Sequence, residues 1–184
     1  MRKLLLAGGA FAALILLAGI ATHDARAAPE RIAWPADYRK NFVIFGWVDR
    51  LDRRPIPVVR VFYVNPEAAT AARAGQPSPE GSVLIMEDRE AQVDASGKVV
   101  LDAAGRLTAT DKVLGVFVQE KRRGWGAEFP ENLRNGDWDY AFFAPDGARR
   151  PTNTNACLGC HKPRTETDYT FIFQRWVMDG KPRR

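Results

Sequence analysis

The run Val58-Val59-Arg60-Val61-Phe62-Tyr63-Val64 is the stretch that decides the fold class of this 184-residue chain. Apart from its arginine, the run consists of valine and aromatic residues, which are typical of β-strands. Pro55 and Pro57 lie just before it and stop any helix that could extend into it. The run therefore predicts a strand over residues 58–64.

Helical and extended patterns lie on both sides of this strand. Apolar residues at helical spacing predict a helix from about Trp34 to Val48. Asn65 is placed to cap a second helix, which begins with Pro66 at its first position and ends before Gly75. Runs rich in β-branched and aromatic residues predict further strands at 82–93, 112–120 and 138–143, of which 138–143 is the last.

Strands joined by turns, with few helices among them, indicate an α+β fold. We expect a mostly antiparallel β-sheet with flanking helices and a helical segment near the C-terminus. Residues 28–184 are numerous enough for one domain with a substantial core, and no linker rich in proline, glycine or serine divides them.

The first 27 residues have the pattern of a secretory signal peptide. Arg2 and Lys3 are followed by an uncharged, mostly apolar run and then by Ala25-Arg26-Ala27, a small-x-small cleavage signature. Cleavage after Ala27 is expected, and the mature chain is then located outside the cytoplasm. In a bacterium this location would be the periplasm. The alternative is an uncleaved N-terminal helix, because the apolar run is long enough for a marginal membrane anchor.

The charge of the chain gives no sign of a nucleic-acid partner. Removing residues 1–27, with three basic residues and one acidic residue, lowers the formal net charge from +5 to +3, so the pI near 9.5 is partly due to the signal peptide. Basic clusters such as Lys121-Arg122-Arg123 remain, but aromatic residues are not interleaved with them as nucleic-acid binding requires. We expect them to be solvated surface or a docking face for an acidic protein.

The most specific motif is Cys157-Leu158-Gly159-Cys160-His161, which contains the only two cysteines of the chain. The spacing C-x-x-C followed directly by histidine is what covalent haem attachment requires: two thiols for the vinyl groups and an imidazole for the iron. A structural disulfide, a redox-active cysteine pair or half of a zinc site are the alternatives. A zinc ribbon needs a second ligand pair that the sequence lacks. We therefore expect one haem c per chain.

The histidine count limits the coordination of the iron. His23 lies inside the predicted signal peptide, so His161 is the only imidazole of the mature chain and the expected proximal ligand. Met86 and Met178 are candidates for the sixth position, as in electron-transfer cytochromes. Met86 lies in an apolar strand, where methionine is also a common core residue. We favour an open sixth site, which implies the binding of a small ligand.

Several segments, taken in order, resemble the cytochrome P460 family. The resemblance extends from about Trp34 to Met178 and is most specific in the last third of the chain. The segments that carry it are Val64-Asn65-Pro66, Pro79-Glu80-Gly81-Ser82-Val83, Gly124-Trp125-Gly126, Arg134-Asn135-Gly136-Asp137-Trp138-Asp139-Tyr140, Cys157 to His161 with Lys162, and Asp168-Tyr169-Thr170-Phe171.

This resemblance implies a homodimeric, mostly antiparallel sheet protein with c-type haem and an open distal site. The enzymatic branch of the family oxidises hydroxylamine or related nitrogen species. The cytochrome c′-β branch binds nitric oxide and carbon monoxide instead. The resemblance leaves open whether this chain is an enzyme. A periplasmic electron-transfer partner is also expected, with the basic clusters described above as a candidate docking face for it.

Two departures from the family pattern favour ligand binding. Family members that oxidise hydroxylamine carry a lysine bonded to the haem macrocycle five residues after the glycine that corresponds to Gly81, and this chain has Met86 there. They also carry an acidic residue just beyond the haem histidine, where this chain has Pro163, with Glu166 nearby but out of register. The other lysines closest to the pattern do not fit it well: Lys98, Lys112 and Lys121.

The expected function is therefore that of a periplasmic mono-haem c-type cytochrome with an open distal site for nitric oxide or a related small nitrogen ligand. Hydroxylamine oxidation stays possible in this interpretation, and a simple electron carrier with a methionine sixth ligand is the alternative. Asp168 is expected to cap the terminal helix. The cofactor-binding candidates are Cys157, Cys160, His161 and Met86, and the apolar candidates for the distal side are Phe42, Phe45, Phe62, Met86, Phe117 and Phe129.

Overall fold

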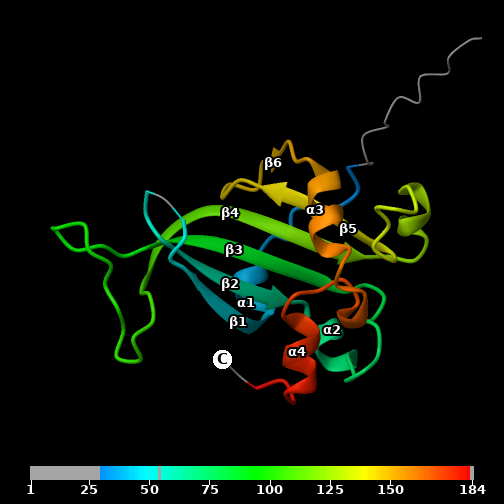
Figure 1. Cartoon of the computed structure of the whole chain (residues 1–184), viewed down its shortest axis with the longest axis horizontal. Helices are drawn as coiled ribbons and strands as arrows, with labels where there is room; N and C mark the ends of the chain where they lie inside the picture. Colours follow the sequence, from blue (N-terminus) through cyan, green and yellow to red (C-terminus); the bar gives the residue numbers. More distant parts are fainter. Residues whose placement is uncertain (1–29, 54, 183–184) are drawn as a thin grey trace, which may run out of the picture.

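Six strands, paired in chain order, form a single antiparallel sheet in this computed structural model, which describes residues 30–53 and 55–182 (Figure 1). The strands are β1 (Val43–Arg50), β2 (Val58–Val64), β3 (Val83–Ala91), β4 (Ala109–Lys121), β5 (Trp138–Phe143) and β6 (Arg149–Arg150). Few and short helices flank this sheet, so the predicted α+β fold class is confirmed. The predicted signal peptide lies outside the described residues.

The predicted helix over 34–48 is wrong beyond a single turn. Only α1 (Tyr38–Asn41) is helical, and Phe42 after it is already extended. Strand β1 then pairs with β2 along its length, with a bulge between Ile44 and Gly46. Pairing with a neighbouring strand satisfies the backbone groups of this segment, and tertiary pairing of that kind overrides a periodicity that sequence alone reads as helical.

The segment after β2 forms a shorter helix than expected. Helix α2 (Pro66–Ala71) begins at the predicted proline but stops well before Gly75. Asn65 precedes it, yet its side chain makes no capping hydrogen bond to the helix. Its Oδ1 instead accepts from the Val83 amide at 2.8 Å, and its Nδ2 donates to the Gly81 carbonyl at 3.2 Å. Asn65 therefore ties the start of α2 to the start of β3.

The C-terminal part of the chain is helical, as predicted. It contains α3 (Thr154–His161), the 3-10 turn η2 (Thr165–Thr167) and α4 (Phe173–Met178), and another 3-10 turn, η1 (Trp125–Glu128), precedes β5. The prediction that 138–143 is the last strand is wrong, because the Pro145-Asp146-Gly147 turn leads into the two-residue strand β6, which pairs with Phe142 and Phe143.

Helices cover the two faces of the sheet unequally. Helices α2, α3 and α4 lie on one face, which we call the helical face (Figure 1). Its core includes Phe45, Val64, Leu84, Tyr140, Leu158, Phe173 and Trp176. The opposite face carries α1 and a second core that includes Tyr38, Val61, Tyr63, Ile85, Val116, Val118 and Phe143. The predicted haem motif thus belongs to the helical face.

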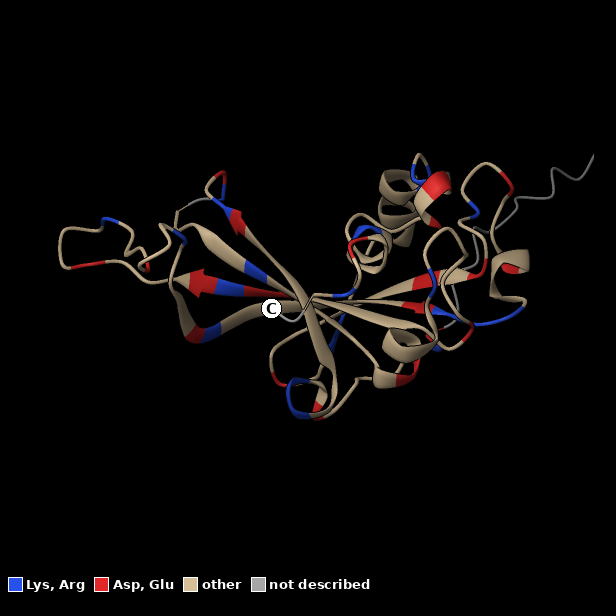
Figure 2. Cartoon of the chain, turned by 90° about the horizontal axis from the view of Figure 1, so that it is seen from below, with Lys and Arg blue, Asp and Glu red and all other residues tan. Residues whose placement is uncertain are grey.

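The chain between β3 and β4 projects beyond one end of the sheet as a long excursion (Figures 1 and 2). It is braced by isolated bridges between Val93 and Val99 and between Leu101 and Leu107. Figure 2 shows acidic and basic residues interspersed along the strands rather than separated onto two surfaces. No helix within the described ranges is long and apolar enough to cross a membrane.

Candidate functional site

Helix α3 contains the whole Cys-x-x-Cys-His motif and packs against β5. Asn153 caps its start by accepting from the Ala156 amide, and Leu158 is completely buried beneath it. Positions three and four apart share one side of a helix, which brings Cys157, Cys160 and His161 together. Both cysteines are free thiols; Cys157 is half-buried, with its pKa raised by burial, and Cys160 is exposed.

A hydrogen bond from one of its two ring nitrogens orients the imidazole of His161. Nδ1 lies 2.7 Å from the carbonyl oxygen of Tyr169, so this nitrogen carries the proton and donates it to the carbonyl. The ring also packs against Tyr140 and Phe171, with both centroid distances at 4.8 Å. Within the part of the chain that the structure describes, Nε2 makes no hydrogen bond.

The protonation state of His161 suits a metal ligand. Burial lowers the pKa of His161, and the positive charge of Arg164 lowers it further, although the hydrogen bond to Tyr169 opposes both effects. The ring is therefore neutral near pH 7, with its proton on Nδ1 and a lone pair on Nε2. A histidine that ligates a metal has this arrangement, with the outer N–H donated to a carbonyl or carboxylate.

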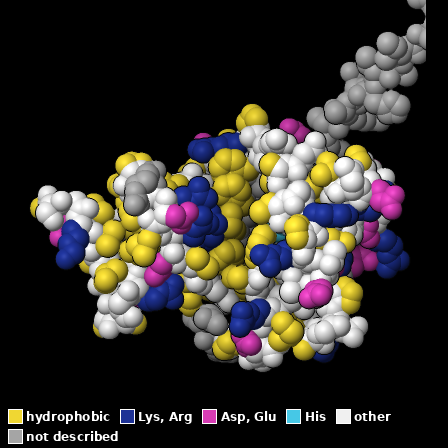
Figure 3. Space-filling view, viewed as in Figure 1, with side chains coloured by type: hydrophobic (Ala, Val, Ile, Leu, Met, Phe, Trp, Pro, Cys, Tyr) yellow, Lys and Arg dark blue, Asp and Glu magenta, His cyan; other side chains and the backbone are white. Residues whose placement is uncertain are grey.

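Four large apolar side chains form a row across the helical face, and the row ends on β5 two residues after Tyr140, whose ring contacts His161. Phe62, Met86, Phe117 and Phe142 are successive register partners on β2, β3, β4 and β5, so they point to the same face. Each is only partly buried. Figure 3 shows a band of apolar side chains down the middle of this face, between charged residues on both sides. We call these four residues the apolar row.

The apolar row is ordered by contacts at both ends. The rings of Phe117 and Phe142 stack with centroids 4.3 Å apart and an interplanar angle of 6°. At the other end, Phe62 packs against Phe45 with ring centroids 5.8 Å apart. Next to Phe62, Gly46 leaves the space that the Ile172 side chain fills, since an added Cβ there would lie 2.8 Å from Ile172 Cδ1.

Charged residues follow the apolar row along β2 and β3. Arg60 and Asp88 are register partners and make two hydrogen bonds, of 2.7 and 2.9 Å, with side chains that are 11% and 12% exposed. Beyond them, Lys112 on β4 pairs with Glu90 at 2.7 Å. A cavity of about 460 Å³ opens here, lined by Arg53, Pro55, Ile56, Val58, Asp88, Glu90, Lys112, Leu114 and Phe117. The acidic groups beside the row are thus already paired.

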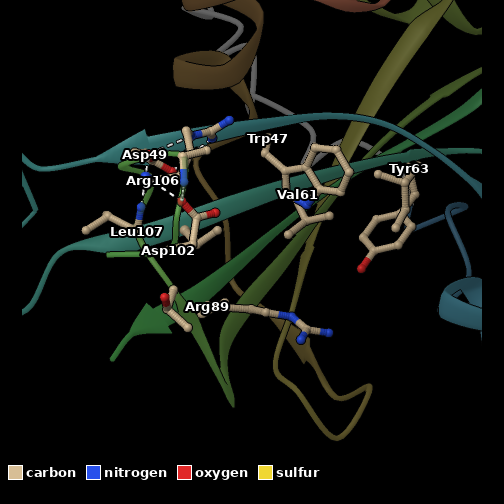
Figure 4. Close-up of a pocket in the computed structure, with 13 residues that line it drawn as sticks. Trp47, Asp49, Val61, Tyr63, Arg89, Asp102, Arg106 and Leu107 are labelled. Atoms are coloured by element: carbon tan, nitrogen blue, oxygen red, sulfur yellow. Dashed lines mark hydrogen bonds and ion pairs between the residues drawn. The ribbon is translucent and has the colours of Figure 1, made fainter. Parts of the chain in front are cut away.

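A second cavity, of about 620 Å³, lies on the opposite face of the sheet (Figure 4). It is formed by Trp47, Val61 and Tyr63 of the strands together with Leu107 and Arg106 from the excursion. Arg106 is held there by Asp49 through hydrogen bonds of 2.8 and 3.0 Å. The sheet separates this cavity from His161.

The structure brings together some of the sequence-predicted site residues and separates others. Met86, Phe62 and Phe117 share the apolar row, while the helix that carries Cys157, Cys160 and His161 packs on the neighbouring strand β5. The other aromatic candidates belong to the cores: Phe45 and Phe129 to that of the helical face and Phe42 to that of the opposite face. Met178 is 55% exposed at the end of α4, whose buried side chains are Phe173, Gln174, Trp176 and Val177.

Two site residues were missed by the sequence analysis. Phe142 was assigned to a strand, but only the register with β4 places it beside Phe117; its position two residues after Tyr140 was the available signal. Tyr169 acts through its backbone carbonyl, which no residue type reveals. The prediction for Asp168 is wrong: it lies at the end of η2 with φ 50°, while Ile172 precedes α4.

The donors present fit a haem group better than the alternatives. Across residues 30–53 and 55–182, no three His, Cys, Asp or Glu side chains gather into a site that could hold a metal ion. This leaves the zinc alternative without further ligands. Two free thiols, a neutral imidazole with a free Nε2 and an adjoining apolar row match the needs of a covalently attached porphyrin.

Comparison with known proteins gives one family match. The sequence profile described as cytochrome P460 matches residues 35–172, about three quarters of the chain. The matched range includes β1 to β6, α3 and the Tyr169 turn. No curated protein matches the chain.

Proposed function

Because the chain belongs to the cytochrome P460 family of haem-containing cytochromes, we propose that it is an exported mono-haem c-type cytochrome that binds nitric oxide or a related small nitrogen ligand. The observation that carries this proposal is the arrangement of His161. Its Nδ1 is held by the Tyr169 carbonyl at 2.7 Å while Nε2 stays available, and its ring contacts Tyr140 on β5, the strand on which the apolar row ends.

In this proposal Cys157 and Cys160 hold the haem vinyl groups as thioethers and His161 Nε2 ligates the iron. The haem supplies an iron centre that takes up small ligands and electrons. The protein contributes the orientation of the imidazole and an apolar surface that keeps water away from the bound ligand.

Ligand binding is favoured over hydroxylamine oxidation by the side chains of the apolar row. Oxidation of hydroxylamine releases protons and needs a base nearby, but Phe62, Met86 and Phe117 cannot accept a proton. Two of the candidate lysines for a bond to the macrocycle are also held in ion pairs. The ammonium of Lys121 is held by Asp168 at 2.9 Å and that of Lys112 by Glu90 at 2.7 Å, while Met86 occupies the position that corresponds to the family lysine.

An electron carrier with Met86 as sixth ligand is the second candidate function. It is supported by the place of Met86 in the middle of the apolar row, between Phe62 and Phe117. Met178 suits this role less, because it is 55% exposed at the end of α4. The two candidates differ in whether the sixth position is free.

Optical spectra of the purified, dithionite-reduced protein distinguish them. We expect a high-spin ferrous haem c spectrum that changes when nitric oxide is added, that does not change with hydroxylamine, and that is the same in Met86→Leu and in the control Met178→Leu. A low-spin spectrum that ignores nitric oxide and is lost only in Met86→Leu would establish the electron carrier instead. A strongly red-shifted Soret band with consumption of hydroxylamine would contradict both.

The mode of attachment has its own test. The pyridine haemochrome of protein exported to a periplasm should report one haem c per chain. The double variant Cys157→Ser/Cys160→Ser should retain no covalent haem. Covalent haem in that variant would overturn the assignment of the two thiols.

Export, a homodimer and a periplasmic redox partner complete the proposal. Export is supported by the signal-peptide pattern of residues 1–27, the redox partner by the basic clusters of the mature chain, and the homodimer by the resemblance to the family. Mass spectrometry of exported protein should find a chain that begins at Ala28. Light scattering should find a mass of two chains. A chain that begins at Met1, or the mass of one chain, would contradict the corresponding part of the proposal.

A further inference from the structure

The turn after η2 has an unusual backbone conformation. Asp168 and Tyr169 have φ of 50° and 59°, in the left-handed region that glycine prefers. A bulky aromatic residue adopts this region only where the surrounding contacts impose it. The result of the conformation is that the Tyr169 carbonyl meets Nδ1 of His161 at 2.7 Å. The contacts that impose the turn therefore control the partner of the histidine.

Lys121, at the end of β4, holds the first residue of this turn. Its ammonium donates to both carboxylate oxygens of Asp168, at 3.1 and 2.9 Å, and to the Ser78 carbonyl at 3.0 Å. The Ser78 amide donates in turn to Asp168 Oδ2 at 2.8 Å. The Lys121 and Asp168 side chains are only 15% and 14% exposed, so water screens their attraction weakly.

Gln119 reaches the second residue of the turn from the same strand. It lies two positions before Lys121 and therefore on the same face of β4. Its Nε2 donates to the Tyr169 carbonyl at 3.1 Å and to the Tyr140 hydroxyl at 3.4 Å. A carbonyl oxygen has two lone pairs, so it can accept from Gln119 and from His161 together. Each donor draws electron density from the oxygen and weakens its bond to the other.

We propose that Gln119 and Lys121 are positioning residues that set the strength of the hydrogen bond from His161 to Tyr169, and through it the electron donation of Nε2 to the haem iron. The inference rests on the proposed function, in which His161 ligates that iron. Lys121 strengthens the bond by holding the carbonyl in place through Asp168, and Gln119 moderates it by sharing the carbonyl. Hydrogen bonds to a ligating histidine tune the basicity of that ligand and the reduction potential of the haem.

The test compares the iron–histidine stretching frequency, from resonance Raman spectra of the ferrous protein, with the midpoint potential of the same samples. Lys121→Met should lower the frequency and raise the potential, because a displaced carbonyl accepts less from the imidazole. Asp168→Asn should also lower the frequency and raise the potential, and it changes no residue of the sheet. If Lys121→Met does not fold, Asp168→Asn alone tests the inference. Gln119→Leu should shift both quantities in the opposite directions, because the carbonyl then serves His161 alone.

The matched control is Lys112→Met, which removes an ammonium from the same strand that pairs with Glu90 and not with the turn. Both quantities should stay at the wild-type values in this variant. Unchanged values in Asp168→Asn, or shifts of equal sign in Gln119→Leu and Asp168→Asn, would overturn the inference. A wild-type protein with covalent haem and a high-spin, five-coordinate ferrous spectrum but without an iron–histidine band would overturn the proposed role of His161 itself.

Discussion

Glu87 is the residue whose environment the sequence least suggests, because a carboxylate at the centre of a strand is completely buried. On the face opposite to Met86 it accepts hydrogen bonds from the guanidinium groups of Arg39, at 2.7 Å, and Arg89, and from the Tyr38 hydroxyl. Burial raises the pKa of Glu87, but the hydrogen bonds from Tyr38, Arg89 and Arg39 outweigh it and hold the pKa below its usual value. The carboxylate is therefore a structural anchor between β3 and α1.

Replacing Glu87 should destabilise the protein and alter its response to acid. Glu87→Gln leaves two arginines without their buried partner, which should lower the free energy of unfolding at pH 7 by about 3 kcal/mol. The pKa is lower in the folded than in the unfolded state, so the unfolded chain binds more protons in acid. The stability that Glu87 contributes is thus present above its unfolded pKa of about 4.3 and disappears as the pH falls through the lower folded value.

Urea denaturation from pH 7 to pH 3 measures both effects. The wild type should lose stability more steeply below about pH 4.3 than Glu87→Gln does. Glu80→Gln serves as the matched control, because its exposed ion pair with Arg123 contributes at most about 1 kcal/mol. Equal acid slopes for the wild type and Glu87→Gln would show that Glu87 is not the titrating anchor.

At the scale of elements, the close pairing of β4 and β5 shapes the apolar row. Gly115 on β4 leaves room for the Phe142 ring, since a Cβ added at Gly115 would lie 2.5 Å from Phe142 Cε2. That ring is the one that stacks on Phe117. A glycine inside a β-strand usually weakens it, and here it allows two aromatic rings to share the surface beside α3.

Gly115→Ala should therefore displace Phe142 and disturb the row. We expect a loss of about 1–3 kcal/mol in the free energy of unfolding, as for other insertions into packed sites, together with a changed rate of nitric oxide binding. Gly159→Ala is the control for stability alone: an added Cβ there meets nothing within 4 Å, and alanine in a helix should be neutral or stabilising. An unchanged stability and an unchanged rate in Gly115→Ala would contradict this role of the glycine.

At the scale of the whole molecule, the sheet has one face that its own helices only partly cover. Phe62, Met86, Phe117 and Phe142 are all partly exposed without a cofactor. A bound porphyrin would bury them further, and folding and haem attachment are then coupled. The protein should reach its full stability only in the haem-loaded form.

Haem-free protein, obtained from Cys157→Ser/Cys160→Ser after extraction of any non-covalent haem, should melt well below the haem-loaded wild type. If each of the four side chains contributes on the order of 1 kcal/mol when haem covers it, the loss corresponds to roughly 10 °C in the melting temperature. Calorimetry of both forms measures this difference. The haem-free form should also bind a hydrophobic dye, and Phe117→Ser should reduce that binding; equal melting temperatures would show that haem does not cover the row.

The strands of the sheet were predictable wherever a run of β-branched and aromatic residues stood between turn residues. This holds for 58–64 and for 138–143, which the structure confirms as β2 and β5. It fails for β1, because apolar spacing in a short segment fits a helix or a strand and only the pairing with β2 decides between them. The side-chain role of Asn65 was missed for the same reason, since its partners lie at the start of β3.

The sequence by itself determined the attachment motif, because two thiols and an imidazole within five consecutive residues are brought together by the covalent chain and one turn of helix. It also determined the α+β class through the alternation of strand runs and turns. Only the tertiary structure decided which aromatic residues stand beside His161 and which group accepts its proton. Those choices depend on strand register and on a backbone carbonyl held by Gln119 and Lys121, contacts between positions about 50 residues apart that local sequence does not encode.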